Sequence, residues 1–398
     1  MTPTERRRTG TGTGTGAGAG AGAGAPGSAA PPEQARDGTE SPGSPDTPRR
    51  RTAPYRGRWI APHRGRWTSP HRSRRTAPHQ GRSTTPRRSR WTDPRRGRRT
   101  AALGAACALA LLTHPLLPDT PGNLASLAGT FLPWSALAVP PLLLYALLRR
   151  SAPAVIGALL PALAWLTLFG DTLTDRSAPG GELTVVSHNV GEDNPDPART
   201  ARALAATGAQ VIAVQELAPA ARDAFRAALP ARYRHHTVQG GVGLWSTYAM
   251  SGAEAVDIMP WPRALRATLT TPKGPVTVYV AHLASVRVTV GAGFATARRD
   301  EAAGLLADAV RRDPSARTLL VGDFNGTTDD RALAPLVRLH GMTSAQEAAG
   351  AGFGFSWPAA FPLTRIDHLL ARGLRPVSAW TLPATASDHL PVGASFAF

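Results

Sequence analysis

Residues 318–325 read Thr-Leu-Leu-Val-Gly-Asp-Phe-Asn, an apolar run that ends in polar side chains. The run predicts a buried strand over Thr318–Gly322, with Asp323 and Asn325 projecting just beyond its carboxyl end. A single Asp after a strand is typical of a turn or a cap. The stretch therefore indicates a functional site only if other strands of the chain end in the same way.

Six other segments place polar side chains beside an apolar run. Strands are predicted over Leu183–Ser187, Val211–Gln215 and Val276–His282, and the region from Thr364 to Phe398 reads as short strands broken by Gly and Pro. The polar residues at the strand ends are Asn189, Glu216, Arg266, His282, Asp367 and the pair Asp388-His389. Sites gather where strands of a sheet end, so seven such segments in this order predict one polar site.

Helices are predicted between these strands. Asp196 followed by Pro197 is typical of a helix start, and Gly208 is typical of its end, which gives a helix to about Thr207. The pattern over Gly291–Arg312 is also helical. The domain therefore alternates strands with helices and hairpins.

The order of these motifs resembles the endonuclease/exonuclease/phosphatase superfamily over about residues 182–398. Gly322-Asp323-Phe324-Asn325 and Ser387-Asp388-His389 are its most specific parts. The resemblance implies an α/β fold, a four-layer sandwich of two mixed β-sheets with helices outside. The apolar segments before the domain and the stretch Gly352–Pro358 are similar to the membrane-anchored VanJ-type subgroup, which is linked to glycopeptide antibiotic resistance.

The resemblance also implies a metal site. Asn189, Glu216 and Asp388 match its ligand positions and offer only oxygen atoms, which suits Mg²⁺, or Mn²⁺, rather than zinc. The metal would neutralise charge on the phosphate as the leaving oxygen departs.

Catalytic roles follow from the same resemblance. His389 matches the general base that deprotonates the attacking water, and Asp367 would orient its ring. Asp323 and Asn325 would position the water or the phosphate from the opposite side. His282 and Arg266 are expected to donate to phosphate oxygens. A family member that has lost activity is the alternative, although every expected position is filled.

Substrate contacts are predicted close to these residues. Ser285 and Arg287, just past His282, are expected to contact phosphate. Trp357, with Phe353 and Phe355, forms either an apolar wall for a lipid chain or an ordinary buried aromatic cluster.

The net charge of +18 belongs to one part of the chain. Residues 1–100 hold 22 Arg and 6 acidic residues, whereas residues 101–398 hold 23 basic and 21 acidic residues. Nucleic acid is therefore an improbable partner for the folded domain. The single cysteine, Cys107, excludes an internal disulfide and a cysteine-based zinc site.

The first hundred residues are predicted to be a disordered tail, because they are rich in Gly, Ala, Pro and Arg. Residues 52–99 repeat with a period of eight, with Pro at every eighth position from Pro54 and Arg from Arg58. Three interpretations stay open for this tail: a simple extension, an arm on anionic lipid, and a nucleic-acid arm.

Residues 101–174 contain three apolar segments, 101–118, 124–148 and 152–170, that predict three transmembrane helices. A cleaved signal peptide is an alternative for the first, and a buried hairpin in a soluble protein is an alternative for the set. Residues 175–182 would be a linker to the catalytic domain at 183–398. The arginines before the first segment and at 149–150 predict a multi-pass protein of the cell membrane, with a cytoplasmic N-terminus and an extracellular domain.

Together these features predict a membrane-anchored, Mg²⁺-dependent phosphoesterase. The subgroup resemblance implies a lipid-linked phosphate or diphosphate substrate similar to undecaprenyl diphosphate, and a link to cell-wall precursor recycling. Two alternatives stay open: an anchored nuclease that acts on external DNA or RNA, and a membrane adaptor without catalytic activity.

Overall fold

The computed structural model describes Trp91, Asp93 and residues 95–119, 122–289, 293–339 and 341–398. The predicted tail at 1–100, with its octad repeats, lies outside the described residues except for Trp91, Asp93 and residues 95–100.

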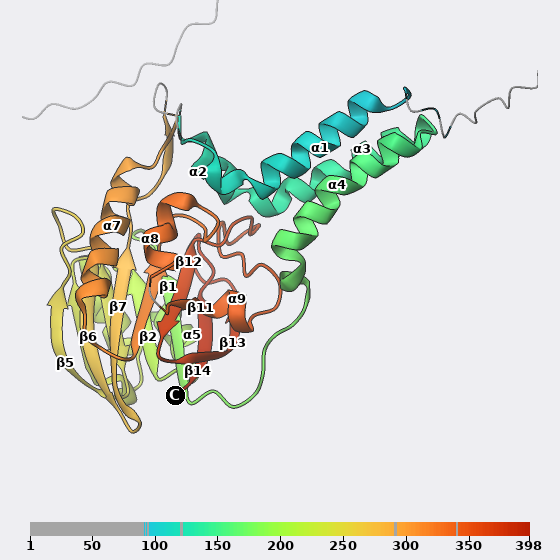
Figure 1. Ribbon diagram of the computed structural model, residues 1–398. Coiled ribbons are helices and arrows are strands. Elements are labelled where there is room, and N and C mark those ends of the chain that lie inside the picture. Colours follow the sequence, from blue (N-terminus) through green and yellow to red (C-terminus); the bar gives the residue numbers. More distant parts are fainter. Residues whose placement is uncertain (1–90, 92, 94, 120–121, 290–292, 340) are drawn as a thin grey trace, which may run out of the picture. The chain divides into compact units, whose positions relative to one another are not determined.

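Two mixed six-stranded sheets form the centre of the catalytic domain (Figure 1). The first contains, in spatial order, β13 (Arg375–Thr381), β14 (Val392–Ala397), β1 (Leu183–Asn189), β2 (Val211–Gln215), β4 (Val242–Ser246) and β3 (His235–Gln239). The second contains β11 (Thr343–Ser344), β12 (Asp367–Arg372), β10 (Thr318–Asp323), β7 (Gly274–His282), β6 (Ala264–Thr271) and β5 (Ala249–Ala255). The predicted strands are all present, and two of them extend by a residue or more to include Asn189 and Asp323.

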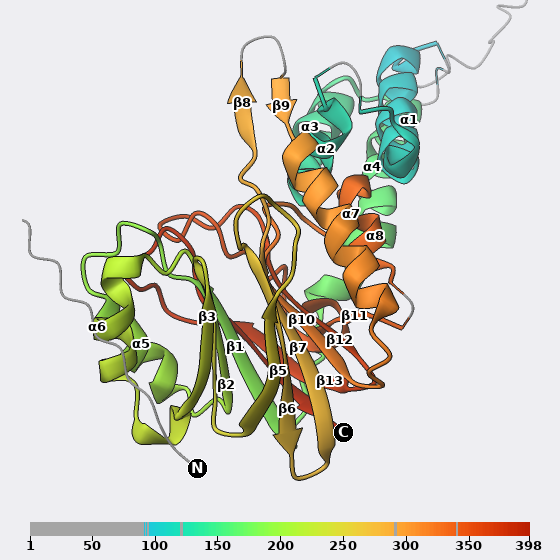
Figure 2. The ribbon, with the colours of Figure 1, turned by 90° about the vertical axis from the view of Figure 1, so that its left-hand side faces the viewer.

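Helices cover the outer face of each sheet (Figure 2). The first sheet is covered by α5 (Pro197–Ala206) and α6 (Arg222–Ala228), and the second by α7 (Ala297–Arg312) and α8 (Ala334–Val337). A short helix, α9 (Ala345–Ala349), lies near β12 and β13. The expectation of two mixed sheets flanked by helices is confirmed.

Three apolar clusters hold these layers together. Leu183 and Val185 of β1 meet Val278 and Val321 of the other sheet between the two sheets. A second cluster joins the second sheet to α7, and a third joins the first sheet to α5 and α6. Alternate side chains along each strand thus enter different clusters, as buried strands require.

The helix predicted over Gly291–Arg312 begins later than expected. It starts at Ala297, because Gly293–Ala295 form β9, which pairs antiparallel with β8 (Arg287–Thr289). The small residues before Ala297 fit a helical pattern by themselves. They form a strand because they pair with Arg287–Thr289, which lie outside the predicted helix. Asp196 does cap α5, where its side chain accepts the Arg199 N–H at 2.8 Å.

The three predicted transmembrane helices are not supported as such. The first is α1 (Arg98–Leu112), and its 15 residues are fewer than the ~17 that a span needs. The second is broken into α2 (Leu124–Thr130) and a segment over Leu132–Leu148, bent by 78°, that includes α3 (Val139–Leu148). Among the described residues, one helix is long and apolar enough to cross a membrane: Ala152–Leu173, which contains α4 (Ala152–Phe169).

Glycines let α1 and α4 approach each other closely. A Cβ at Gly104 would lie 1.9 Å from the Gly157 carbonyl oxygen, and a Cβ at Gly157 would lie 2.3 Å from the Ala101 Cα. Backbone contact of this kind fixes the two helices side by side.

An ion pair fixes the end of α7 to the second sheet. Asp313 follows α7, and its Oδ2 accepts from Arg266 Nε at 2.6 Å and from the Tyr279 hydroxyl at 2.6 Å. Burial alone would raise the pKa of Asp313, but the hydrogen bonds from Arg266, Ser315 and Tyr279 outweigh it and hold that pKa well below its ordinary value. The folded state is therefore stabilised by ionised Asp313.

We expect Asp313→Asn to lower the free energy of unfolding by about 1–3 kcal/mol at pH 7, because Arg266 and Tyr279 lose a charged acceptor. Ionised Asp313 contributes to the free energy of unfolding above the ordinary aspartate pKa of about 4, and this contribution is lost progressively as the pH falls below that value. Denaturant unfolding at pH 7 and at pH 3 measures both effects, and the two proteins should differ less at pH 3. Asp308→Asn, at the exposed end of an ion pair with Arg311, is the control and should change stability little.

Candidate functional site

The polar residues identified from sequence meet at one edge of the sandwich. Asn189 ends β1, His282 ends β7, Asp323 ends β10 and Asp367 begins β12. Asp323 lies opposite Asp367 in the antiparallel pair β10–β12 and opposite His282 in the parallel pair β10–β7. Asn189 Nδ2 donates to Asp323 Oδ2 at 3.0 Å, which brings the ends of the two sheets together.

In the motif Gly322-Asp323-Phe324-Asn325, Gly322 and Phe324 have structural roles. Gly322 has φ 142°, and a Cβ there would lie 1.9 Å from the Ala281 carbonyl oxygen, so only Gly permits this approach of β10 to β7. Phe324 is fully buried and packs in the core beneath α7. The motif therefore fixes the backbone that carries the two polar side chains.

Asn325 adopts a left-handed conformation, with φ 49°. Its backbone N–H donates to Asp323 Oδ1 at 2.8 Å, and its Nδ2 donates to the Leu283 carbonyl at 3.0 Å. These bonds turn the side chain toward the end of β7. Its Oδ1 is left as the acceptor atom of the amide.

His389 and Asp367 form a buried pair. His389 Nδ1 lies 2.8 Å from Asp367 Oδ2, and its Nε2 lies 3.8 Å from Asp323 Oδ2. The Ser356 hydroxyl accepts the backbone N–H of Asp367 at 3.2 Å, so residue 356 helps to place the carboxylate. The ring is thereby held with Nε2 facing Asp323.

Charge in this pair shifts two pKa values. Burial alone would lower the pKa of His389, but the carboxylates of Asp367, Asp323 and Asp388 outweigh it and raise that pKa. Burial, and then the neighbouring Asp367 carboxylate, raise the pKa of Asp323. The gathered carboxylates contribute to both shifts, whereas burial adds to the shift of Asp323 and opposes that of His389.

His282 lies beside the same carboxylates. Its Nε2 is 3.4 Å from Glu216 Oε1 and 3.6 Å from Asp323 Oδ2. Arg263 NH1 lies 3.2 Å from the same nitrogen, which therefore accepts from the guanidinium. Burial, with the positive charges of Arg263 and His389, holds the pKa of His282 well below its ordinary value. The ring is thus neutral at neutral pH.

The structure does not bring Arg266 to this site. Arg266 lies opposite Tyr279, and its guanidinium is paired with Asp313 at 2.6 Å and with Glu254 at 3.7 Å. Arg263, which precedes β6, occupies the place expected for it. Both arginines occur in Arg263-Ala-Leu-Arg266, and only the register of β6 on β7 shows which one lies at the catalytic edge.

The residue types fit a divalent cation. Four carboxylates, those of Glu216, Asp323, Asp367 and Asp388, gather at the site, and Asp367 Oδ1 is buried without a hydrogen-bond partner. Ligand atoms of Asp323, Asp367 and His389 lie within 4.8 Å of one another. A buried carboxylate oxygen without a donor is costly unless a cation neutralises it.

The three predicted ligands each have an oxygen near this group. Glu216 has φ 55°, a strained conformation for this residue type that directs its side chain toward His282. Asp388 Oδ2 accepts from Trp357 Nε1 at 3.1 Å. Asn189 Oδ1 accepts the Gly191 N–H at 3.1 Å. A second lone pair stays on each of these oxygens for a cation.

A cavity of about 420 Å³ opens over the catalytic groups. Its lining includes Glu216, Asp323, Asn325, Asp388 and His389 on the polar side. The other lining residues are Leu127, Thr130, Phe131, Ser285, Val286, Val288, Phe294, Trp357, Thr364 and Ile366. Of the predicted substrate contacts, Ser285 and Trp357 line this cavity, and Arg287 does not.

Trp357 holds Asp388 through its indole N–H, a role that its sequence context did not reveal. Phe353 and Phe355 turn away from the catalytic groups. Phe353 packs against Trp165 and Phe169, and Phe355 stacks on Trp134 with ring centroids 5.8 Å apart. These two rings belong to the contact with the N-terminal helices.

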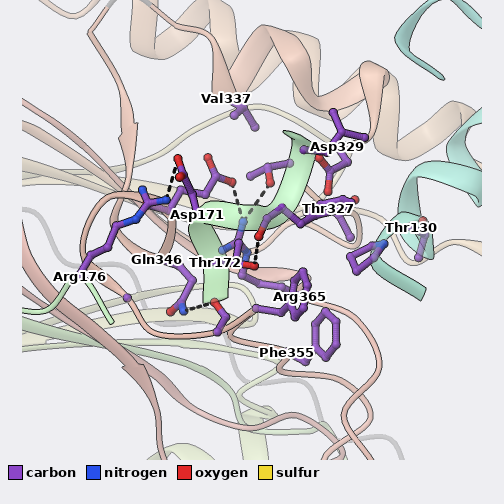
Figure 3. Close-up of a pocket in the computed structure, with 18 of the residues that line it drawn as sticks. Thr130, Asp171, Thr172, Arg176, Thr327, Asp329, Val337, Gln346, Phe355 and Arg365 are labelled. Carbon is purple, nitrogen blue, oxygen red and sulfur yellow. Dashed lines mark hydrogen bonds and ion pairs between the residues drawn. The ribbon is translucent and has the colours of Figure 1, made fainter. Parts of the chain in front are cut away.

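A second cavity of about 530 Å³ is lined by Arg365, whose chain neighbours Thr364 and Ile366 line the first (Figure 3). Figure 3 shows Arg176 beside Asp171, which pair at 2.9 Å, and Arg365 at the same cavity pairs with Glu347 at 2.6 Å. Its lining includes Phe353 and Phe355, and none of the residues predicted for catalysis or metal binding. The charges that face each other here are already neutralised, so the first cavity is the stronger candidate for catalysis.

Comparison with known proteins gives the same picture. A model of the Endonuclease/Exonuclease/phosphatase family matches residues 186–389, about half of the chain. No curated protein matches the sequence.

Solved structures of similar fold include a mannosyl-6-phosphatase from Bacteroides thetaiotaomicron (15% identity, TM-score 0.47, covering 55% of this chain and 100% of that one). They also include beta toxin from Staphylococcus aureus (15%, 0.45, 54% and 99%). A third is D. rerio TDP2 with a single-strand DNA product (18%, 0.45, 54% and 99%). These identities are too low to transfer a substrate from any of the three.

We expect Mg²⁺ or Mn²⁺ to raise the unfolding temperature of the protein, because a cation that binds only the folded state stabilises it. At a concentration 100 times its dissociation constant the gain is about 2.7 kcal/mol. Glu216→Gln and Asp388→Asn should each reduce the shift, and Glu254→Gln, beside Arg266, should leave it intact. An unfolding temperature that does not respond to either cation would contradict a metal site here.

Proposed function

Because the chain belongs to the endonuclease/exonuclease/phosphatase family, we propose that it is a metal-dependent phosphoesterase acting on a phosphate or diphosphate linked to an apolar chain. Members of this family are hydrolases that act on phosphoester bonds. The proposal assigns the carboxylate and histidine groups of the first cavity to catalysis and its apolar side to the rest of the substrate.

His389 is the proposed general base. Asp367 holds Nδ1 at 2.8 Å and so directs Nε2 toward the cavity. A bound cation would neutralise the carboxylates that raise the pKa of His389, so the ring could lose its Nε2 proton and then take one from the attacking water. Asp323 or the Oδ1 of Asn325 would accept the second hydrogen of that water. The proton would move to His389 Nε2 as the water oxygen attacks phosphorus and the bond to the leaving oxygen breaks.

Glu216, Asn189 and Asp388 are the proposed ligands of Mg²⁺ or Mn²⁺, which would supply positive charge to the phosphate oxygens. Arg263, in place of Arg266, would donate N–H groups to the phosphate, while neutral His282 accepts from Arg263 and keeps the guanidinium in position. Trp357 holds Asp388 from the other side.

The composition of the cavity supports the substrate class. The lining combines the carboxylates and His389 with apolar residues that include Leu127, Phe131, Val288 and Phe294. Among the described residues, no Arg or Lys lines it, and the proposed phosphate contact Arg263 lies beside His282, outside the lining. Nucleic-acid binding depends on a path of such residues along the backbone, whereas a phosphate group with an apolar chain matches this composition.

Membrane attachment is part of the proposal. Because α2 packs on the catalytic domain, both would lie outside the cell, which requires α1 and the segment Leu132–Leu148 to cross the bilayer together with Ala152–Leu173. Arg149 and Arg150, between the last two of these crossings, would stay in the cytoplasm. The substrate would then be an undecaprenyl diphosphate-like carrier, with a link to glycopeptide resistance. The arginine-rich tail at 1–100 would contact anionic lipid on the cytoplasmic side.

We expect the full chain in detergent to release phosphate from farnesyl diphosphate in the presence of Mg²⁺, and EDTA to stop the reaction. His389→Gln should lower kcat by about 10²–10⁴-fold, because the general base is lost. His236→Gln, at an exposed position on β3, is the control and should retain activity. Plasmid nicking without phosphate release would identify a nuclease. No activity in either assay would favour the membrane adaptor without catalytic activity.

The two arginines give a second test. Arg263→Ala should lower kcat/KM by about 10–100-fold, which is the effect of losing a charged hydrogen bond of about 1.5–3 kcal/mol. Arg266→Ala should instead lower stability, because it leaves Asp313 without its ion-pair partner. Steady-state kinetics and thermal unfolding of both variants separate these outcomes, and the reverse pattern would return the phosphate contact to Arg266.

A further inference from the structure

A buried ion cluster joins α2 to the catalytic domain. Arg299, at the start of α7, has a fully buried side chain whose NH2 lies 2.7 Å from Asp330 Oδ2 and 2.6 Å from Asp300 Oδ1. Ser126 of α2 enters the same cluster, because its hydroxyl donates to Asp330 Oδ2 and accepts from Arg299 NH2 at 3.2 Å. Every charge in the cluster has a partner, which a buried guanidinium requires.

The same guanidinium reaches the catalytic loop. Arg299 NH1 donates to the Asn325 carbonyl at 3.2 Å, and Asn325 in turn is bonded to Asp323. One side chain therefore links the backbone of a catalytic residue to a helix that lies nearly two hundred positions earlier in the chain.

Close backbone contacts surround this cluster. The Thr327 hydroxyl donates to the Gly129 carbonyl at 3.2 Å, and a Cβ at Gly129 would lie 3.2 Å from the Asp329 carbonyl oxygen. At the other end of α2, Asn123 Nδ2 donates to the Phe294 carbonyl at 2.6 Å. The helix is thus held both to the catalytic loop and to the β8–β9 hairpin, which projects at the same end of the domain in Figure 2.

From this fixed position α2 contributes to the cavity over the catalytic groups. Leu127, Thr130 and Phe131 line it together with Glu216, Asp323 and Asp388. The apolar surface continues outward, since Phe131 is 40% exposed, Leu124 is 59% exposed and Val288 of β8 is 80% exposed. An apolar chain that extends out of the cavity would contact this surface.

We infer that α2 is part of the active site: Leu127 and Phe131 bind the apolar part of the substrate, and the Ser126–Asp330–Arg299 cluster positions Asn325 for catalysis. This inference rests on the proposed function and extends it, because α2 lies outside the family match at 186–389. The catalytic unit is therefore larger than the family domain, and a chain that begins at the domain would lack one wall of its cavity.

The test compares two Mg²⁺-dependent substrates, farnesyl diphosphate and dimethylallyl diphosphate, which differ only in chain length. With the full chain in detergent, Leu127→Ser should lower the ratio of kcat/KM for the long over the short substrate by about tenfold, as expected for losing one buried leucine contact. The matched control is Leu137→Ser, because Leu137 is 65% exposed and does not line the cavity.

Ser126→Ala tests the ion cluster separately. It should lower kcat several-fold on both substrates alike, with little change in KM, because it disturbs Asn325 and leaves Leu127 in place. Ser135→Ala is its control, since the Ser135 hydroxyl bonds only the Leu132 carbonyl. Thermal unfolding of each variant identifies losses that come from misfolding.

The outcomes separate the two proposals. Hydrolysis by the wild type, with the chain-length ratio unaffected by Leu127→Ser and with Ser126→Ala equal to Ser135→Ala, would overturn the inference and leave the proposed function standing. A wild type that hydrolyses neither substrate would overturn the proposed function, and the inference with it. A lowered ratio for Leu127→Ser alone, among properly folded variants, supports α2 as the substrate wall.

Discussion

The hydrogen bond from Asn189 to Asp323 connects the carboxyl ends of the two sheets, and the arrangement of the site depends on it. Asp323 is held on one side by this bond, on a second side by the backbone of Asn325, and on a third by its position opposite Asp367 and His282. The contacts with Asn325, Asp367 and His282 belong to the second sheet and its loop, whereas the bond from Asn189 forms only when the two sheets pack face to face. Packing of the sandwich therefore completes the site.

Four carboxylates at this edge lower the stability of the folded state unless a cation neutralises them. Burial and repulsion from Asp367 raise the pKa of Asp323, and attraction to the carboxylates raises the pKa of His389. Asp367 Oδ1 is left without a donor. Strain accompanies the charge, since Glu216 and Asn325 both adopt positive φ angles immediately after their strands. Stability is supplied elsewhere, by the three apolar clusters and by ion pairs such as Arg266–Asp313.

The N-terminal helices have a closer relation to the site than their composition suggests. Segment 124–148 reads as one continuous apolar stretch, yet its first part turns by 78° and packs on the catalytic loop through Ser126 and Gly129. Ser126 of this apolar helix bonds the buried Arg299–Asp330 pair. The helix therefore forms a wall of the cavity and also attaches the N-terminal helices to the domain. The aromatic residues Phe353 and Phe355 add to this contact from the domain side.

The sequence by itself determined the strand ends that carry Asn189, Glu216, His282, Asp323 and Asp367, because apolar runs that stop at polar residues reflect local burial. The two-sheet fold class was implied by the family resemblance that those motifs carry. Only the tertiary structure decided between Arg263 and Arg266, since strand register is set by the pairing of β6 with β7. It also decided that Trp357 holds Asp388, that the second apolar segment bends, and that Arg299 joins α2 to Asn325. Those contacts join residues far apart in the chain, and pairing at such a distance is fixed by packing and not by any local pattern.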